Sequence, residues 1–280
     1  MNILRVFPHK TSITPDDNMV RIGTQTMSLP QHDEVHISCT FTWDMDYCEY
    51  LQEQYQAITD KPVLLGGPAY NSPCDAHIPG LYTKQGVIFT SRGCNNNCPW
   101  CFVPEREGKL KELPVFPGNI INDNNFLQCS QKHQQSVFDM LRKQKQICFK
   151  GGLQPDLITV EFADTVRALK ISELWLACDI DEDLIKFKKA CAILIRAGFS
   201  RNHIRCYALI GDDMDKNEAR LQEIWNSGAM PFAQLYQPPE REKKEYSMHW
   251  KEFARMWSRP AAIRAHMTKG TRLEDYRRIT

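Results

Sequence analysis

The stretch LWLACDIDEDLIKFKKACAILIRAGFSRNHIRCYALIG, residues 174–211, decides the fold of this chain. It begins with an apolar run at 174–178 and continues with apolar residues at helical spacing over 182–198, where Gly198 ends the pattern. A second run of β-branched and aromatic residues follows at 204–211. A strand, a helix and a strand in this order predict two parallel strands joined by a right-handed crossover.

The same alternation extends over most of the chain. Short strand-like runs occur at 86–91, 119–123, 147–151, 174–178, 204–211 and 231–237. Further helical patterns separate them, and one of these opens at Ser130, a candidate N-cap. The sequence therefore predicts an α/β fold, a partial (β/α)6 TIM-like barrel, with its site in loops at the carboxyl ends of the strands.

The flanking segments predict two additions to this barrel. Residues 1–85 contain a strand at 34–41, a helix at 46–58 and a strand at 62–68, which indicate a small α/β domain. The barrel then spans 86–240, and a basic helical extension spans 241–280. This extension has two open interpretations: contact with nucleic-acid phosphates, or a helix whose aromatic residues pack against the barrel edge.

Composition limits the classes of partner. The 280 residues are 42% hydrophobic and carry a formal net charge of +1, so no strong overall field attracts nucleic acid or an anionic membrane. No apolar stretch approaches the ~20 residues that a transmembrane helix needs, and the amino terminus does not resemble a signal peptide. We expect a cytoplasmic protein that does not associate with membranes.

Cysteine usage indicates metal ligation. The chain has 11 cysteines, an odd number that a complete disulfide framework cannot use. We expect the eight scattered ones to be small buried hydrophobes. The other three, Cys94, Cys98 and Cys101, lie together in TSRGCNNNCPWCFVPEREG, residues 90–108, directly after a predicted strand. The chain has no second CxxC pair for structural zinc and no fourth cysteine of ferredoxin type, so three thiolates favour a cluster with one open iron.

This loop resembles the defining motif of the radical S-adenosylmethionine (SAM) superfamily, in which three cysteines with these gaps follow the first barrel strand. The resemblance implies a [4Fe-4S] cluster on Cys94, Cys98 and Cys101, with Trp100 at the aromatic position before the last ligand. It further implies SAM as a cofactor, reductive cleavage to a 5'-deoxyadenosyl radical, hydrogen abstraction from a substrate, and an electron donor such as flavodoxin or ferredoxin.

The resemblance also suggests contacts to the SAM amino group near the end of the second barrel strand. The family often has Gly-Gly-Glu there, whereas this chain has Asp123, Asn124 and Asn125. Their carboxylate and amide oxygens can accept hydrogen bonds from an ammonium group. The alternative is a polar turn preceding the helix at Ser130.

Other expected SAM contacts lie at later strand ends. Gly151 and Gly152 can let the backbone approach the ligand. Asp179 is placed to meet the ribose hydroxyls, and Ile210 and Gly211 are placed to flank the adenine. An ordinary role at a strand end is the alternative for each of these residues.

The sequence resembles more than one subfamily of radical SAM proteins. The loop resembles both methylthiotransferases and cobalamin-dependent radical SAM proteins, and PVLLGGP at 62–68 is similar to a strand end of the cobalamin-binding domain. Asp75, His77 and Gly80 match a cobalt-ligating pattern, but that pattern normally follows the first strand and opens a helix. The whole chain resembles uncharacterised short radical SAM proteins with a truncated cobalamin-binding-like amino-terminal domain.

Three functions therefore stay open. The first is a radical SAM enzyme with an unknown substrate, and the second is a tRNA- or nucleic-acid-modifying methylthiotransferase-like or methyltransferase-like version of it. The third is a non-catalytic iron-sulfur or zinc module. The sequence does not name a catalytic residue; Tyr207, Cys178 and Tyr236 are the strand residues to mutate first.

Overall fold

The computed structural model describes residues 1–24, 28–71 and 77–269. The chain forms two compact units, one of Met1–Gly118 with Pro238–Lys243 and one of Asn119–Gln237 with Lys244–Thr280. The first unit includes the cysteine loop, and the domain boundaries at residues 85 and 240 stay predictions.

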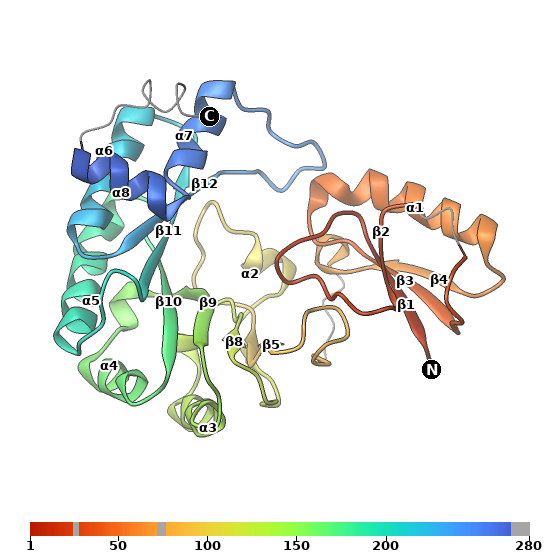
Figure 1. Cartoon of the computed structure of the whole chain (residues 1–280), viewed down its shortest axis with the longest axis horizontal. Helices are drawn as coiled ribbons and strands as arrows, with labels where there is room; N and C mark the ends of the chain where they lie inside the picture. Colours follow the sequence, from red (N-terminus) through yellow and green to blue (C-terminus); the bar gives the residue numbers. More distant parts are fainter. Residues whose placement is uncertain (25–27, 72–76, 270–280) are drawn as a thin grey trace. The chain divides into compact units, whose positions relative to one another are not determined.

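The first unit contains a sheet of four strands in the order β2-β1-β3-β4, with every neighbouring pair parallel. The strands are β1 (Ile3–Phe7), β2 (Val20–Ile22), β3 (Glu34–Ser38) and β4 (Val63–Gly66). Helix α1 (Met45–Ile58) joins β3 to β4 and lies along this sheet (Figure 1). Its Cys48, Leu51 and Tyr55 are fully buried in the same core as the strand residues, because the apolar residues of α1 fall on one face.

Shorter elements complete the first unit. They are two 3-10 turns, η1 (Thr42–Asp44) and η2 (Pro68–Tyr70), the strands β5 (Val87–Ile88), β6 (Ser91–Arg92) and β7 (Lys111–Glu112), and the helix α2 (Val103–Arg106). The cysteine loop lies between β6 and β7.

The larger sheet has six strands in the order β12-β11-β10-β9-β8-β5. Its strands in the second unit are β8 (Ile120–Ile121), β9 (Ile147–Leu153), β10 (Ile171–Ala177), β11 (Ile204–Ile210) and β12 (Met230–Leu235). Neighbours from β8 to β12 are all parallel, as the strand-helix-strand pattern predicts. Each of the six predicted strand segments overlaps one strand of this sheet.

The sheet is open rather than closed. Its strand order starts at β12 and ends at β5, and these two strands are not neighbours in the part of the chain that the structure describes. The structure therefore confirms an α/β fold with parallel strands. It does not confirm a TIM-like barrel.

Helices cover one side of the larger sheet. They are α3 (Gln131–Leu141), α4 (Val160–Arg167), α5 (Leu184–Arg196) and α6 (Met214–Asn226), seen along the outer side of the sheet in Figure 1. Three 3-10 turns, η3 (Phe126–Gln128), η4 (Pro155–Leu157) and η5 (Asp181–Asp183), lie between these elements. Ser130 caps α3 as predicted, because its side chain accepts a hydrogen bond from the backbone N–H of His133.

The two faces of the sheet differ in burial. In β11, Ile204, Cys206, Ala208 and Ile210 are buried and alternate with half-buried residues such as Tyr207. Successive strand side chains point to opposite faces, so one face packs against the helices and the other is left for a site.

The edge strand β12 packs against the carboxyl-terminal helix α7 (Met248–Met256), which is followed by α8 (Pro260–Lys269). The backbone N–H of Ala233 donates to the carbonyl of Trp257 over 3.1 Å. Phe253 and Trp257 are buried, which confirms the predicted aromatic packing face. The basic residues after Lys269 lie outside the described residues.

The scattered cysteines behave as expected. The described ones are all buried, namely Cys39, Cys48, Cys129, Cys148, Cys178, Cys191 and Cys206, whereas Cys74 lies outside the described residues. Among the described helices, none has the length and apolar character required to span a bilayer.

Candidate functional site

A small antiparallel hairpin holds the cysteine loop. Strand β6 pairs with β7 through Ser91 opposite Glu112 and Arg92 opposite Lys111. The N–H of Leu113 extends the pairing by donating to the carbonyl of Thr90 over 2.8 Å. This pairing brings together the two ends of the segment that carries the three cysteines.

Gly93 fixes the start of the loop. Its φ of +78° is unfavourable for residues with a side chain, and a Cβ atom at this position would lie 2.3 Å from the carbonyl oxygen of Lys109. The N–H of Cys94 then donates to the carbonyl of Gly108 over 3.1 Å. The first cysteine is therefore held against the segment that follows α2.

Backbone hydrogen bonds also shape the cysteine positions. The N–H of Cys101 donates to the carbonyl of Cys98 over 3.0 Å, which closes a turn between the second and third cysteines. The N–H of Asn96 donates to Cys94 Sγ over 3.4 Å. Cys94 and Cys98 are half-buried and Cys101 is exposed.

The three thiols of the loop form the donor set for the implied cluster. Among the described residues, no group of three or more His, Cys, Asp or Glu side chains is gathered as a metal-binding set. The three thiols nevertheless come from one short loop, remain accessible, and are the soft ligands that iron-sulfur clusters use. The loop therefore fits a cluster by its chemistry.

Glu107 is a feature of this loop that the sequence did not indicate. The Glu107 side chain is only 2% exposed, although Glu107 directly follows the charged residues Glu105 and Arg106 of α2. Its carboxylate accepts from the N–H of Gly93 over 3.4 Å and pairs with Arg92 and Arg106. In a sequence, a glutamate among charged residues usually indicates a turn exposed to solvent. The burial of Glu107 can therefore be recognised only from its contacts in the structure.

The structure brings together three of the predicted SAM-binding residues in the second unit. Asp123, Gly151 and Gly152 line one small pocket at the ends of β8 and β9. A Cβ atom on Gly151 would lie 1.7 Å from the backbone oxygen of Asp123, so the two strand ends approach closely only because this residue is glycine. Gly152 lies within β9 and has a φ of +104°, a backbone conformation that favours glycine.

Asn125 lies beside this pocket in a side-chain network. Its Nδ2 donates to Gln154 Oε1 over 2.7 Å, and Gln128 Nε2 donates to the same oxygen over 3.0 Å. Asp123 and Asn125 are almost fully buried, while Asn124 is half-buried. Gln154 was not predicted as part of this region, because it lies beyond the glycine pair in sequence.

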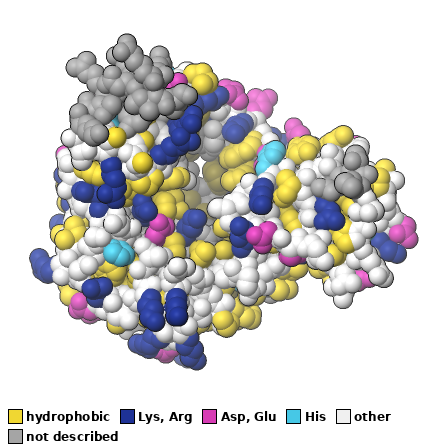
Figure 2. Space-filling view, viewed as in Figure 1, with side chains coloured by type: hydrophobic (Ala, Val, Ile, Leu, Met, Phe, Trp, Pro, Cys, Tyr) yellow, Lys and Arg dark blue, Asp and Glu magenta, His cyan; other side chains and the backbone are white. Residues whose placement is uncertain are grey.

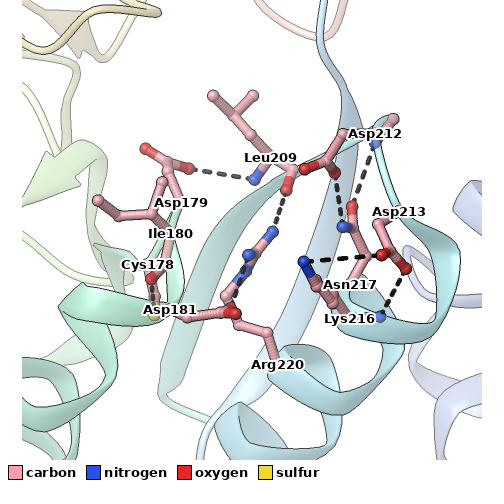
Figure 3. A network of polar contacts seen from close by, with 11 residues as sticks. Cys178, Asp179, Ile180, Asp181, Leu209, Asp212, Asp213, Lys216, Asn217 and Arg220 are labelled. Atoms are coloured by element: carbon pink, nitrogen blue, oxygen red, sulfur yellow. Dashed lines mark hydrogen bonds and ion pairs between the residues drawn. The ribbon is translucent and has the colours of Figure 1, made fainter.

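Asp179 connects two strand ends, as Figure 3 shows. Its Oδ1 accepts a hydrogen bond from the N–H of Leu209 over 3.1 Å, which links the end of β10 to β11. Nearby, the buried Arg220 donates to the carbonyl of Leu209 over 2.6 Å and to Asp181 over 2.9 Å. The structure thus gives Asp179 a strand-end role, and contact with a ribose stays a prediction.

Gly211 and Ile210 end β11. The N–H of Gly211 donates to the buried Asn217 over 3.1 Å, and its φ of +129° favours glycine. A Cβ here would also lie 2.5 Å from Tyr246 Oη. The side chain of Ile210 is only 2% exposed, and its carbonyl accepts from the N–H of Tyr236 over 2.9 Å, so contact with the adenine stays a prediction.

The residues chosen for first mutation have different environments. Tyr207 stacks on Trp175 with ring centroids 4.4 Å apart, and its hydroxyl donates to the carbonyl of Lys150. Cys178 is fully buried, and burial raises the pKa of its thiol to about 12. Tyr236 is half-buried after β12. Tyr207 therefore lies on the face opposite the helices, whereas Cys178 does not reach it.

His77 has an apolar environment in the first unit. Its ring lies edge-on to Phe89 and Phe116, and its Nε2 has no hydrogen-bond partner within the described part of the chain. The next helix after His77 is α2, which is distant in sequence, and Asp75 lies outside the described residues. In the described residues from His77 to Phe102, no helix follows directly, as a cobalt-ligating motif would require.

Comparisons with known proteins concern mainly the fold. No family model and no curated protein matches this chain. The chain is similar to the structure of the radical SAM methyltransferase TsrM from Kitasatospora setae, which contains cobalamin and a [4Fe-4S] cluster. The match has a TM-score of 0.60 at 12% identity and covers 85% of this chain and 76% of that one. The two chains share a fold.

Proposed function

We propose that this chain is a radical SAM enzyme that binds a [4Fe-4S] cluster through Cys94, Cys98 and Cys101. The observation that carries the proposal is the three-cysteine loop, held by β6 and β7, in a chain with the fold of a radical SAM methyltransferase. When bound, the cluster would supply the electron that cleaves SAM to a 5'-deoxyadenosyl radical.

The chain's own residues would bind and orient SAM. Asp123 and the neighbouring amides offer oxygens that accept hydrogen bonds from its ammonium group. Gly151 permits the close approach of β8 and β9 that forms the pocket. The backbone around Gly211, at the end of β11, offers further polar groups. The half-buried face of β11 that carries Tyr207 would receive the substrate.

Anaerobic reconstitution with iron and sulfide tests cluster binding. We expect about four irons per wild-type chain and loss of most of that iron in Cys94→Ala, Cys98→Ala and Cys101→Ala. Cys191→Ala is the matched control, because Cys191 is buried in α5. Equal iron in the control and the three variants would contradict the ligand assignment.

SAM binding at the open iron gives a second test. We expect SAM to change the electron paramagnetic resonance spectrum of the reduced cluster, because a thiolate-free iron can take a new ligand. Asp123→Asn should weaken this response, since a neutral amide attracts the SAM ammonium less than a carboxylate does. An identical SAM titration in Asp123→Asn would remove Asp123 from the site.

Cobalamin-dependent methyl transfer is the second candidate. The parallel sheet of the first unit reverses its order between β1 and β3, the position where such sheets bind ligands, and the TsrM structure contains cobalamin. Gly67 gives no separate support, because a Cβ there would lie 2.6 Å from the Cys39 carbonyl oxygen, so packing alone requires glycine. Saturable retention of hydroxocobalamin by the holoprotein would support this candidate, and no retention would remove it.

Nucleic-acid modification has weaker support. Basic side chains are dispersed among acidic and uncharged ones on the face drawn in Figure 2. Part of the basic extension lies outside the described residues. RNA binding therefore stays a prediction, which a salt titration of RNA affinity tests, because phosphate contacts weaken steeply with salt.

A further inference from the structure

A chain of contacts crosses the base of the cysteine loop. Glu107 Oε2 lies 3.4 Å from Arg92 Nε, and Glu107 Oε1 lies 3.1 Å from Arg106 Nη2. Each guanidinium in turn stacks on an aromatic ring, Arg92 on Phe89 at 4.5 Å and Arg106 on Phe102 at 5.7 Å. We name Arg92, Glu107 and Arg106 the loop clamp.

The side chains of the loop clamp are largely shielded from solvent. The Glu107 side chain is 2% exposed, and the two arginine side chains are 20% and 21% exposed. A carboxylate removed from water is costly unless charged and hydrogen-bonding partners compensate. Glu107 has the two guanidinium groups and also the N–H of Gly93. Glu105, two positions earlier, is exposed and has no such role in the described contacts.

The clamp joins the two sides of the cysteine segment. Arg92 ends β6 and is followed by Gly93, directly before the first cysteine. Arg106 belongs to α2, whose N-cap Phe102 directly follows the third cysteine. Glu107 therefore ties the chain entering the cysteine segment to the chain leaving it, and it does so without donating a ligand.

We propose that Glu107 is a positioning residue for the cluster. It ties together the two ends of the segment that carries the three thiols, and its negative charge offsets one of the two adjacent guanidinium charges. This inference rests on the proposed cluster on Cys94, Cys98 and Cys101. It adds Glu107, which is not a ligand, to the residues that cluster binding requires.

Two measurable effects follow from replacing Glu107 with glutamine. The amide keeps the size of the side chain but weakens both ion pairs, so the loop should release iron to a chelator about 10-fold faster, as expected when a group that orients ligands is lost. The loss of one negative charge leaves two guanidinium groups near the cluster. The midpoint potential should therefore shift to a more positive value, since positive charge favours the reduced cluster.

The experiment compares wild type, Glu107→Gln and the matched control Glu105→Gln after anaerobic reconstitution. Iron content, iron release to a chelator and midpoint potential are measured for each, with circular dichroism of the iron-free protein as a check of folding. We expect only Glu107→Gln to lose iron faster and to shift in potential. Glu107→Asp, which restores the charge, should return the potential toward the wild-type value.

The outcomes separate this inference from the proposed function. A wild-type protein that takes up no cluster would overturn both. A wild-type cluster with the same potential and iron release in Glu107→Gln and Glu105→Gln would overturn the role of Glu107 alone. If Glu107→Gln does not fold, Arg106→Gln, which removes a single clamp contact, must show the faster iron release for the inference to stand.

Discussion

Gly93 and Lys109 lie so close that a Cβ atom on Gly93 would be 2.3 Å from the Lys109 carbonyl oxygen. This contact places the residue before the first cysteine against the segment after α2. Two constraints therefore require glycine before Cys94. The space beside Gly93 does not admit a side chain, and the φ of Gly93 is +78°.

Substitution of Gly93 with alanine should therefore damage the loop. We expect Gly93→Ala to lose most of its iron on reconstitution, because the clash shifts the Cys94 backbone. The backbone strain of about 1–2 kcal/mol at positive φ adds to an overpacking cost of about 1–3 kcal/mol. Iron content and thermal melting measure the two effects.

Gly108→Ala is the control for that experiment. Gly108 has a similar φ of +73°, but a Cβ there would meet nothing within 4 Å. Gly108→Ala should lower the melting temperature through backbone strain but should retain its iron. Similar iron loss in both variants would indicate that backbone strain, rather than the Lys109 contact, is what matters.

Gly151 offers a test of the SAM pocket. A Cβ on Gly151 would lie 1.7 Å from the Asp123 backbone oxygen, so Gly151→Ala should separate β8 from β9 and weaken SAM binding to the reconstituted protein. Anaerobic calorimetry measures the affinity. Gly228→Ala is the control, because its Cβ would meet only the flexible end of Ile195. Unchanged SAM affinity in a folded Gly151→Ala protein would place SAM elsewhere.

Arg220 should contribute more stability than its ion-pair partner Asp181. Arg220 is 7% exposed and Asp181 is 53% exposed, and only Arg220 also binds the Leu209 carbonyl. We expect Arg220→Met to lower the free energy of unfolding by about 2 kcal/mol, because it leaves a carbonyl unsatisfied. Asp181→Asn should cost less than about 1 kcal/mol. Urea denaturation compares them, and equal losses would show that the ion pair dominates.

His77 should make stability depend on pH. Burial lowers the pKa of His77 below its ordinary value of 6.5, even though the Val87 backbone favours the charged ring. The unfolded chain therefore binds this proton more readily than the folded chain. The free energy of unfolding should fall as the pH drops below 6.5 toward the folded-state pKa, and be fully retained above 6.5.

Denaturation at several pH values measures this contribution of His77. His77→Phe should flatten the decline below the ordinary histidine pKa, because phenylalanine does not titrate and can pack between the same rings. His249→Gln, at an exposed position on α7, is the control and should leave the decline unchanged. A wild-type decline preserved in His77→Phe would assign it to other groups.

The sequence predicted the strands of the larger sheet well, because their apolar runs are separated by helices of clear period. It missed β1, the inner strand beside β3, because Arg5 interrupts the apolar run. In the structure Arg5 is buried and pairs with Asp17, so the charge does not prevent a buried strand. Helix α4 was also missed, since it is short and begins with the β-branched Val160.

The site was predictable to a different extent. Local spacing was enough to propose the three cysteines as ligands, because all of them lie in one loop, and their role as ligands stays a prediction. Asp123 and Gly151 are far apart in sequence, and their approach depends on the pairing of β8 with β9. The buried position of Glu107 depends on contacts across the loop to Arg92, which no local pattern of charges contains.

Reductive cleavage of SAM tests the central claim most directly. Wild type and Cys98→Ala would be reconstituted anaerobically, reduced with dithionite in the presence of SAM, and assayed for 5'-deoxyadenosine. We predict this product from the wild type alone. A wild-type protein that holds about four irons per chain and forms no 5'-deoxyadenosine would contradict the proposed function and favour a non-catalytic cluster.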